Sequence, residues 1–228
     1  MTASRYYVIG AASGIGGAVH TSLAATGAEV LGLDLNPNDD VVRFDVTAEE
    51  DWNSLDLNDC KGLVITSGIR KPAPLAKTSL DDWRDVMDIN VTGAFLGLRR
   101  LAQVCDGGYD AQGLPVVLVS SAVTSKTVSG QASYNTSKGA IDALVRSAAL
   151  ELAPYGVRVN SVNPGSIRTP MTADGWNDES HANRMRAEIP AGRAGTAEEV
   201  AAVIISLLRP EFGYVTGSSW RVDGGWSL

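Results

Sequence analysis

Three side chains in the middle of the chain have the types and spacing needed to move a proton. Tyr134 and Lys138 are four residues apart, and Ser121 lies thirteen residues before Tyr134. If this segment is helical, residues four apart share a face, which brings the Lys138 ammonium beside the Tyr134 phenol. A tyrosine base near neutrality needs its pKa of about 10 lowered by roughly three units, or about 4 kcal/mol. One positive charge at about 4 Å can supply this. The alternative is a surface Tyr and Lys on an ordinary helix.

Composition limits the kinds of partner that this chain can have. Its 228 residues, 44% of them hydrophobic, are enough for one well-buried core, so we expect a single domain over residues 1–228. A net charge of −7 opposes binding to nucleic acid or to an anionic membrane surface. A small-molecule partner is therefore expected.

Targeting signals and metal-binding patterns are not evident in the sequence. The longest apolar run, from Ala201 to Leu208, is far below the roughly 20 residues that span a bilayer, and we expect a cytoplasmic protein with no membrane partner. Cys60 and Cys105 stand in unrelated contexts, which suits reduced core thiols better than a disulfide or a metal site. No metal site is predicted.

Short β-branched runs alternate with helical patterns along the chain. This alternation predicts a doubly wound α/β fold of the Rossmann type, with a parallel sheet of about seven strands and helices on both faces. The expected strands are Tyr6 to Ile9, Glu29 to Leu33, Val41 to Phe44, Gly62 to Thr66, Pro115 to Ser120, Val157 to Val162 and Ser219 to Val222.

Helix ends are also marked in the sequence. The patterns that begin at Thr47 and Thr196 predict capping boxes, in which a hydroxyl and a carboxylate bind the first free amides. Pro154 and Gly156 are expected to end the helix that carries Tyr134. The stretch at residues 169–195 has no regular pattern, and we interpret it as a loop that forms a substrate lid.

A glycine-rich turn follows the first expected strand. Its residues are Gly10, Ser13, Gly14, Ile15 and Gly16, and a helical pattern comes next. Glycines let the backbone approach a pyrophosphate closely, and the helix N-terminus offers free amides and a partial positive charge. The position of the turn favours dinucleotide binding over a simple tight turn.

Asp34 ends the second strand, about twenty residues after the glycines. A carboxylate at this point can accept hydrogen bonds from an adenosine ribose and repels a 2′-phosphate, which predicts NAD over NADP. Arg43 is the only nearby cation that could reverse this preference. The alternative for Asp34 is a solvated carboxylate at a strand end. Asp45, after the third strand, could meet an adenine amine.

With the glycine turn, Asp34, Ser121, Tyr134 and Lys138 in this order, the sequence resembles the short-chain dehydrogenase/reductase family over its whole length. The resemblance implies that Tyr134 is the catalytic base or acid, that Ser121 orients the substrate oxygen, and that Lys138 binds the nicotinamide ribose and lowers the tyrosine pKa. It also implies that Asn90 holds a water in a proton relay; a helix-kinking amide is the alternative. The remaining cofactor-binding residues would be Leu35, Val46, Ser67, Gly68, Pro164, Gly165, Ile167 and Thr169.

Two departures from the family pattern stand out. The family has a threonine before the first glycine and Asn-Asn-Ala-Gly after the fourth strand, where this chain has Ile9 and Ile65-Thr66-Ser67-Gly68. We interpret this as loss of a polar support, replaced by apolar packing. The segment from Asp45 to Ile65 is short, which predicts a truncated helix, and the few residues after Gly225 are expected to limit closure of the pocket by the tail.

The expected function is interconversion of a hydrophobic secondary alcohol and its ketone by an NAD-dependent oxidoreductase. Substrate-facing candidates are Val123, Ser125, Met171 and Trp176, with lid packing or a subunit contact as the alternative for the last two. A catalytically silent NAD sensor or scaffold, and a lyase or epimerase using bound NAD, are the competing functions. The resemblance implies a homotetramer, or less readily a dimer. The helix from Ala132 to Leu152 is apolar on more than one face and would need a partner to cover it; burial in the monomer is the alternative.

Overall fold

A seven-stranded parallel sheet forms the centre of the computed structural model, which describes residues 5–228. The strand order is β3-β2-β1-β4-β5-β6-β9, and every expected strand is present. The bounds are β1 Arg5–Ile9, β2 Val30–Asp34, β3 Val41–Arg43, β4 Cys60–Ile65, β5 Pro115–Val119, β6 Arg158–Pro164 and β9 Ser219–Val222. The predicted doubly wound α/β fold is confirmed.

The direction of winding reverses between β1 and β4. The chain builds outward from β1 through β2 to β3, returns to β4 beside β1, and continues through β5 and β6 to β9. Ile9, the last residue of β1, lies between Leu33 of β2 and Ile65 of β4. Three strands therefore end side by side at the switch point, where open α/β sheets bind their ligands.

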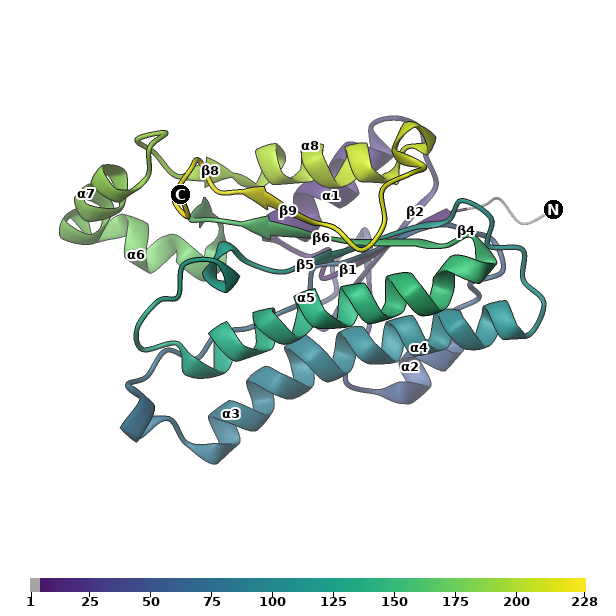
Figure 1. The fold of residues 1–228 in the computed structure, drawn as a ribbon, viewed down its shortest axis with the longest axis horizontal. Helices are drawn as coiled ribbons and strands as arrows, with labels where there is room; N and C mark the ends of the chain where they lie inside the picture. Colours follow the sequence, from purple (N-terminus) through teal and green to yellow (C-terminus); the bar gives the residue numbers. More distant parts are fainter. Residues whose placement is uncertain (1–4) are drawn as a thin grey trace.

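Helices cover both faces of the sheet (Figure 1). On one face α1 (Gly14–Ala24) packs against α8 (Ala197–Leu208), and on the other lie α2 (Glu49–Ser54), α4 (Gly93–Asp106) and α5 (Ala132–Leu152), with α3 (Leu80–Met87) extending beyond the sheet. Short helical turns complete the chain: the 3₁₀ turns Leu75–Lys77, Ala122–Thr124, Ala153–Tyr155, Pro170–Thr172 and Pro210–Phe212, and the π-helical turn Asp88–Thr92.

Side chains of the central strands divide between two cores. Ile9, Ile65 and Leu118 face the core under α4 and α5, whereas Val8 and Val64 face the core under α1 and α8. Successive strand residues point to opposite faces, so a strand covered on both sides must be apolar throughout. This is why the strands could be predicted as continuous apolar runs.

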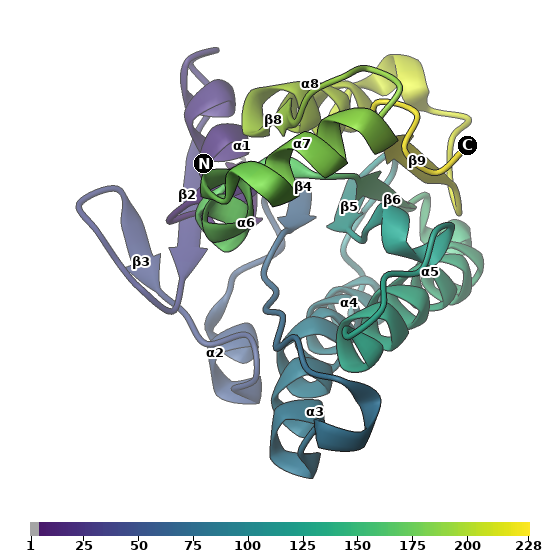
Figure 2. The same cartoon turned by 90° about the vertical axis from the view of Figure 1, so that its left-hand side faces the viewer.

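Residues 169–195 form helices, and the prediction of an irregular loop is wrong. The segment contains α6 (Ala173–Asn177) and α7 (Glu179–Glu188), which Figure 2 shows at one end of the sheet. Asp178 caps α7 by accepting a hydrogen bond of 2.6 Å from the His181 amide. The two short strands β7 (Ile167–Arg168) and β8 (Gly195–Thr196) pair at the base of this excursion. The sequence pattern was weak because α7 buries only Ala182 fully.

One of the two predicted capping boxes exists. Thr196 and Glu199 cap α8 reciprocally, with backbone-to-side-chain bonds of 3.2 and 2.9 Å. The box predicted at Thr47 is wrong, because its hydroxyl donates to Asp45 at 2.7 Å and the N-cap of α2 is Ala48. The prediction of a truncated helix between Asp45 and Ile65 is confirmed, because α2 has six residues. As predicted, α5 ends before Pro154, and Gly156 (φ +77°) turns the chain.

The junction of β1 and β4 combines apolar packing with a retained polar tie. Ile9 and Ile65 are 0% and 3% exposed and join the same core, as the packing interpretation required. However, the hydroxyl of Thr66 donates to the Ile9 carbonyl at 2.8 Å and lies 3.2 Å from that of Gly10. The expected loss of polar support is therefore wrong, because the residue after Ile65 still ties the two strands together.

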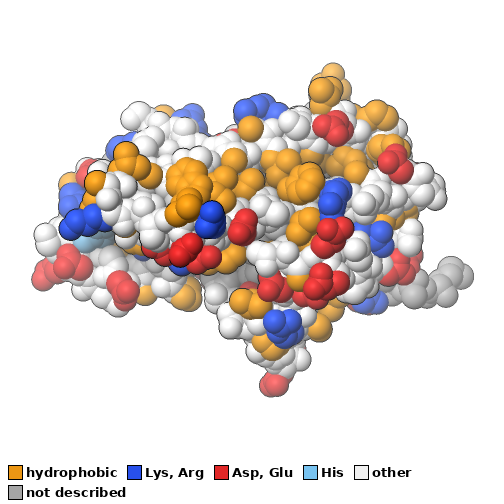
Figure 3. Space-filling view, turned by 90° about the horizontal axis from the view of Figure 1, so that it is seen from below, with side chains coloured by type: hydrophobic (Ala, Val, Ile, Leu, Met, Phe, Trp, Pro, Cys, Tyr) orange, Lys and Arg blue, Asp and Glu red, His pale blue; other side chains and the backbone are white. Residues whose placement is uncertain are grey.

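Most apolar residues of α5 are buried within the monomer. Ile141, Val145, Ala148, Ala149 and Leu152 belong to the core beneath α5, and Leu144 packs against it. The sequence argument that these residues need a partner is wrong, because the helix packs against both the sheet and α4. The face that carries these helices still exposes Phe95 and Leu150, and Figure 3 shows hydrophobic groups along its middle.

Cys60 and Cys105 are both free and buried, as expected for core thiols. Among residues 5–228, no helix combines the length and apolar character needed to span a bilayer.

Candidate active site

A cleft of about 730 Å³ opens at the carboxyl ends of the central strands. It brings together residues that the sequence places far apart, from β1, β2, β4, β5, α5 and the loop after β6. The predicted site residues that line it are Gly10, Ser13, Gly14, Ile15, Gly16, Asp34, Leu35, Asp45, Val46, Ser67, Gly68, Ser121, Tyr134, Lys138, Pro164, Gly165, Ile167, Thr169 and Met171.

The glycine turn requires glycine for steric reasons at two positions. Gly10 has φ +85°, and a Cβ there would lie 2.6 Å from the Thr66 hydroxyl. A Cβ at Gly16 would lie 2.0 Å from the Gly10 carbonyl oxygen. The turn leads into α1, whose N-cap Ser13 makes no side-chain capping bond. The first amides of α1 consequently remain available to an anionic group such as a pyrophosphate.

Asp34 braces the glycine turn and also faces the cleft. Its carboxylate accepts hydrogen bonds from the amides of Ala12 at 3.1 Å and Asn36 at 3.0 Å. Arg43 lies beside it in the β2–β3 register. Asp45 accepts from the Thr47 amide and hydroxyl at 2.9 and 2.7 Å, and these bonds lower the pKa of Asp45. Both carboxylates retain acceptor capacity toward the cleft.

The segment after β4 also fits a dinucleotide. The Ser67 hydroxyl lines the cleft, is buried and has no hydrogen-bond partner within residues 5–228. A buried polar atom without a partner is costly, and a ligand hydrogen bond would satisfy it. A Cβ at Gly68 would lie 3.2 Å from the Asn90 amide oxygen and 3.4 Å from Lys138 Nζ. Glycine therefore lets both side chains approach the cleft.

The loop after β6 closes the opposite wall. A Cβ at Gly165 would meet the Asp223 backbone at 2.7 Å, so the loop packs directly on the segment after β9. Thr169 and Thr172 form a capping box at the turn that follows. A Cβ at Gly14 would lie 3.5 Å from the Thr169 side chain. This loop thus reaches across to the glycine turn and encloses the middle of the cleft.

Ser121, Tyr134 and Lys138 meet on the inner wall. Ser121 begins the turn after β5 and lines the cleft together with Tyr134, while Lys138 lies one turn further along α5. Lys138 is 4% exposed, and its Nζ donates to the Val119 carbonyl at 2.8 Å. The Nζ atom lies 5.6 Å from the centre of the Tyr134 ring. The helical face predicted from the spacing therefore exists.

Burial controls the protonation of both residues. It raises the pKa of Tyr134, whereas the Ser121 hydrogen bond and the charge of Arg70 lower it. Burial also lowers the pKa of Lys138 to about 8, opposed by the nearby Asp142 carboxylate. The expected lowering of the Tyr134 pKa by Lys138 is not what the structure shows, because desolvation of the phenol is the largest effect and Arg70 is the cation that opposes it.

Asn90 occupies the π-helical turn between α3 and α4 and is 2% exposed. Its amide donates to the Ile69 carbonyl and the Ser137 hydroxyl, each at 3.0 Å, and accepts from the Ile69 amide at 2.8 Å. The Ser137 hydroxyl in turn donates to the Tyr134 carbonyl at 2.8 Å. Asn90 thus links the segment after β4 to the helix of Tyr134, which justifies an asparagine here.

Three substrate-facing candidates do not line the cleft. Ser125 is exposed, Val123 is buried, and Trp176 is 6% exposed within a cluster that we call the tryptophan cluster. Its buried members are Ala122, Trp176, Ala182, Ile189, Ala194 and Trp226. Trp176 therefore packs within this cluster and does not face the substrate, as the packing alternative predicted. Trp226 of the short tail belongs to this cluster and its indole donates to Glu188 at 3.3 Å, but no residue after Gly225 lines the cleft.

Comparisons with known proteins agree over the whole chain. The family model described as "Enoyl-(Acyl carrier protein) reductase" matches residues 10–227. The short-chain reductase protein NovJ of Streptomyces niveus is 31% identical, with 96% of this chain and 92% of the relative covered. The chain belongs to the short-chain dehydrogenase/reductase family. It is accordingly an oxidoreductase that acts on a CH–OH group.

Other relatives and structures in this family support the same fold. A trans-4-hydroxycyclohexanecarboxylate dehydrogenase of Sinomonas cyclohexanicum is 30% identical, with 96% of this chain and 90% of the relative covered. An NADP complex from Agrobacterium tumefaciens, described as a 2-deoxy-d-gluconate 3-dehydrogenase, superposes with a TM-score of 0.90 at 28% identity over 99% of this chain and 97% of that one. An NADH complex of 4-hydroxyisoleucine dehydrogenase gives 0.87 at 26% over 98% of each chain.

Two charged residues of this short-chain dehydrogenase/reductase site were missed from the sequence. Arg70 lies after β4 and acts on Tyr134, although its only signal was a basic pair, Arg70-Lys71, close behind Gly68. Asp142 lies one turn after Lys138 on α5 and accepts from Asn163 at 2.9 Å, while Asn163 also donates to Thr124 at 3.1 Å. The spacing of Lys138 and Asp142 is the signal that could have revealed this support.

Proposed function

We propose that this chain interconverts a secondary alcohol and its ketone with NAD, using Tyr134 as the general base and acid. The observation that carries the proposal is that Ser121, Tyr134 and Lys138 line the same cleft as the glycine turn and Asp34. In the oxidative direction the alcohol loses a hydride and a proton to give the ketone, with NADH as the reduced product.

Each residue of the inner wall has a defined task. A nicotinamide bound in the cleft would supply the hydride acceptor. Tyr134 accepts the hydroxyl proton, and Ser121 donates a hydrogen bond to the substrate oxygen as charge develops on it. Lys138 is held by Val119 at the cleft wall, where its remaining N–H groups can bind a ribose hydroxyl.

Asp34 supports NAD as the cofactor. Its carboxylate faces the cleft at the end of β2, where it can accept from both ribose hydroxyls and would repel a 2′-phosphate. Arg43 lies next to it on the edge strand, but the Asp34 carboxylate braces the glycine turn directly. Asp34 lines the cleft and Arg43 does not, so the charge that faces the ribose site is negative, which favours NAD.

An alicyclic secondary alcohol is the substrate class that we propose. The cyclohexane substrate in the name of the Sinomonas relative supports it, as does the apolar Met171 at the cleft wall. NADH formation, followed by absorbance, should occur with a panel of cyclic secondary alcohols and NAD, and should be slower with NADP. Tight NAD binding without reduction by any alcohol would instead indicate a nucleotide sensor.

We also propose a cytoplasmic homotetramer. Two free buried cysteines suit a reducing compartment. Phe95 on α4 and Leu150 on α5 are exposed, and a second copy could cover them. Light scattering after size exclusion should give the tetramer mass, and replacing both residues with glutamate should reduce it. A monomeric wild type would contradict this.

A further inference from the structure

Arg70 lies beside the cleft, in contact with two segments that line it, and has no assigned role. It follows Ile69, a lining residue whose amide and carbonyl are both bound by Asn90. Its guanidinium reaches across to the segment before α6 and donates to the Met171 carbonyl at 2.7 Å. Met171 lines the cleft as well. Arg70 thus stands at the rim between the catalytic wall and the lid.

The position of Arg70 is fixed relative to the catalytic helix. Asn90 binds Ile69 on one side and Ser137 on the other, and Ser137 donates to the Tyr134 carbonyl. This series of hydrogen bonds connects the backbone just before Arg70 to the backbone of Tyr134. The positive charge of Arg70 is close enough to act on the Tyr134 phenol. A group bound by Arg70 would therefore lie beside the proton-transfer site.

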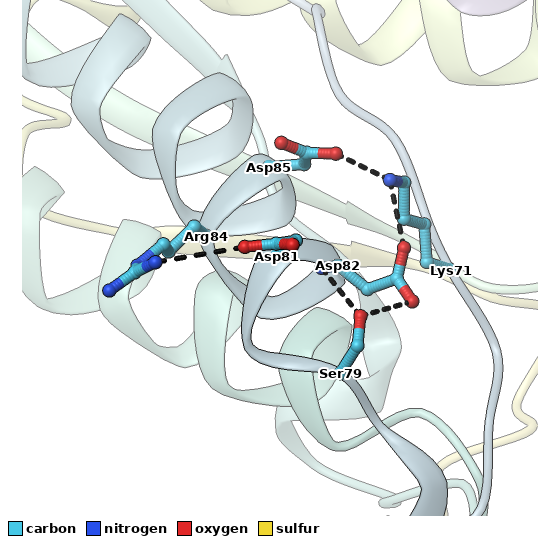
Figure 4. A network of polar contacts seen from close by, with 6 residues as sticks. All are labelled: Lys71, Ser79, Asp81, Asp82, Arg84 and Asp85. Atoms are coloured by element: carbon cyan, nitrogen blue, oxygen red, sulfur yellow. Dashed lines mark hydrogen bonds and ion pairs between the residues drawn. The ribbon is translucent and has the colours of Figure 1, made fainter.

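The neighbouring cation shows what is unusual about Arg70. Lys71 is held by two carboxylates of α3, Asp82 and Asp85, and Figure 4 shows its ammonium between them. Its charge is neutralised within the fold. Arg70 forms no ion pair in the part of the chain that the structure describes, residues 5–228. Its bond to a neutral carbonyl leaves the charge and most of its N–H donors unused.

We propose that Arg70 binds a carboxylate of the substrate, so that this enzyme acts on hydroxy acids whose hydroxyl reaches Tyr134. A guanidinium presents paired N–H donors that match the two oxygens of a carboxylate. The hydrogen bond to Met171 orients the planar group and ties it to the lid segment. The nearby Asp85 does not oppose an acidic substrate, because Lys71 neutralises it. The inference rests on the proposed function and narrows its substrate class.

The kinetic test compares an acid with its neutral ester. Wild type, Arg70→Gln and Lys77→Gln are assayed with 4-hydroxycyclohexanecarboxylate and its methyl ester. Wild type should prefer the acid in kcat/KM, and Arg70→Gln should reduce that preference by about ten- to hundredfold, as loss of a charge-assisted hydrogen bond would. The ratio cancels any effect of Arg70 on Tyr134 that is common to both substrates. Lys77→Gln removes the same charge from an exposed lysine that does not line the cleft, and it should keep the preference.

A binding test separates this inference from the proposed function. Cyclohexanecarboxylate has no hydroxyl to oxidise, so its binding needs no turnover. It should raise the melting temperature of wild type in the presence of NADH more than its methyl ester does, and Arg70→Gln should remove that difference. Equal shifts by acid and ester, or an acid preference that survives Arg70→Gln, overturns the inference even if neutral alcohols are oxidised. Acid-selective binding that depends on Arg70 supports it even if no alcohol is oxidised.

Discussion

The cofactor end and the substrate end of the cleft are built by different means. At the cofactor end, the ends of β1, β2 and β4 and the glycine turn set the geometry through backbone contacts, such as Gly16 against Gly10. At the substrate end, the lid is held by side chains from distant segments: Trp226 from the tail, Arg70 from the segment after β4, and Lys126 from the turn after β5. The first design tolerates few substitutions, and the second allows substrate preference to change without altering the fold.

The largest effect is expected at the residue shared by both ends. Tyr134→Phe should lower kcat/KM by about 10³-fold, because general acid–base catalysis of this kind contributes about 10²- to 10⁴-fold. NAD affinity, measured by fluorescence titration, should change little. Because burial raises the pKa of Tyr134, the oxidation rate of wild type should rise as pH increases into the alkaline range. Turnover that survives the substitution would refute the assignment of Tyr134.

Trp226→Ala should damage the substrate end alone. Trp226 is 7% exposed. Its backbone carbonyl accepts a hydrogen bond from the Lys126 ammonium at 3.0 Å, and the same ammonium lies 4.8 Å from the centre of the indole ring. Removing a buried tryptophan typically costs about 3 to 5 kcal/mol. We expect the substrate KM to rise strongly and the lid to become more sensitive to limited proteolysis.

The matched control for Trp226 is Trp220→Ala. Trp220 is 36% exposed on the edge strand β9, away from the lid. It should leave the substrate KM unchanged. If Trp226→Ala instead weakens NAD binding as much as substrate binding, the two ends are not independent.

Lys138→Met should abolish activity but stabilise the fold at pH 7. Burial holds the pKa of Lys138 at about 8, well below its ordinary value of 10.5, so the folded chain carries a costly buried charge below pH 8. That cost is about 3 kcal/mol, offset by roughly 1 kcal/mol for the hydrogen bond to Val119. The melting temperature should exceed that of wild type at pH 7, and the gain should shrink as pH rises from about 8 toward 10.5. A lower melting temperature at pH 7 would contradict this.

Asp34→Ala tests the cofactor end with the smallest expected effect. Removing the carboxylate takes away both the ribose acceptor and the repulsion of a 2′-phosphate. The ratio of kcat/KM with NAD to that with NADP should fall by about tenfold or more, or at least about 1.4 kcal/mol. Asp45→Ala is the matched control, since Asp45 lies in the same cleft but after β3. A ratio unchanged by Asp34→Ala would remove the basis for NAD preference.

The difference between the cofactor end, built from local backbone geometry, and the substrate end, held by distant side chains, also explains which features could be predicted from the sequence. Strands covered on both faces must be apolar throughout, so β1, β4 and β5 were recognised from short runs of residues. The glycine turn and the Tyr134–Lys138 pair also depend on local spacing. The helices α6 and α7 were missed because few of their residues are buried, and what holds them is the tryptophan cluster, which includes Trp226 some forty residues later.

The other wrong predictions from the sequence concern side chains whose partner in the structure differs from the one that the local pattern suggests. The Thr47 hydroxyl matches a capping pattern, but the Asp45 carboxylate two residues earlier takes its hydrogen bond. The apolar faces of α5 suggested a subunit contact, although α4 and the sheet cover them. Arg70 was overlooked because the sequence does not show which of two adjacent cations has an acidic partner. In the structure, Lys71 pairs with two carboxylates, whereas Arg70 has no ion pair among residues 5–228.

The tryptophan cluster also gives the enzyme an optical signal of its own. Trp176 and Trp226 are two of the five tryptophans, and both are buried in this cluster, Trp176 on α6 and Trp226 in the tail. Indole emission overlaps the absorption of reduced nicotinamide, so energy transfer from these two rings would report when NADH is bound. Binding and release of NADH could therefore be timed by stopped-flow fluorescence without attaching a dye.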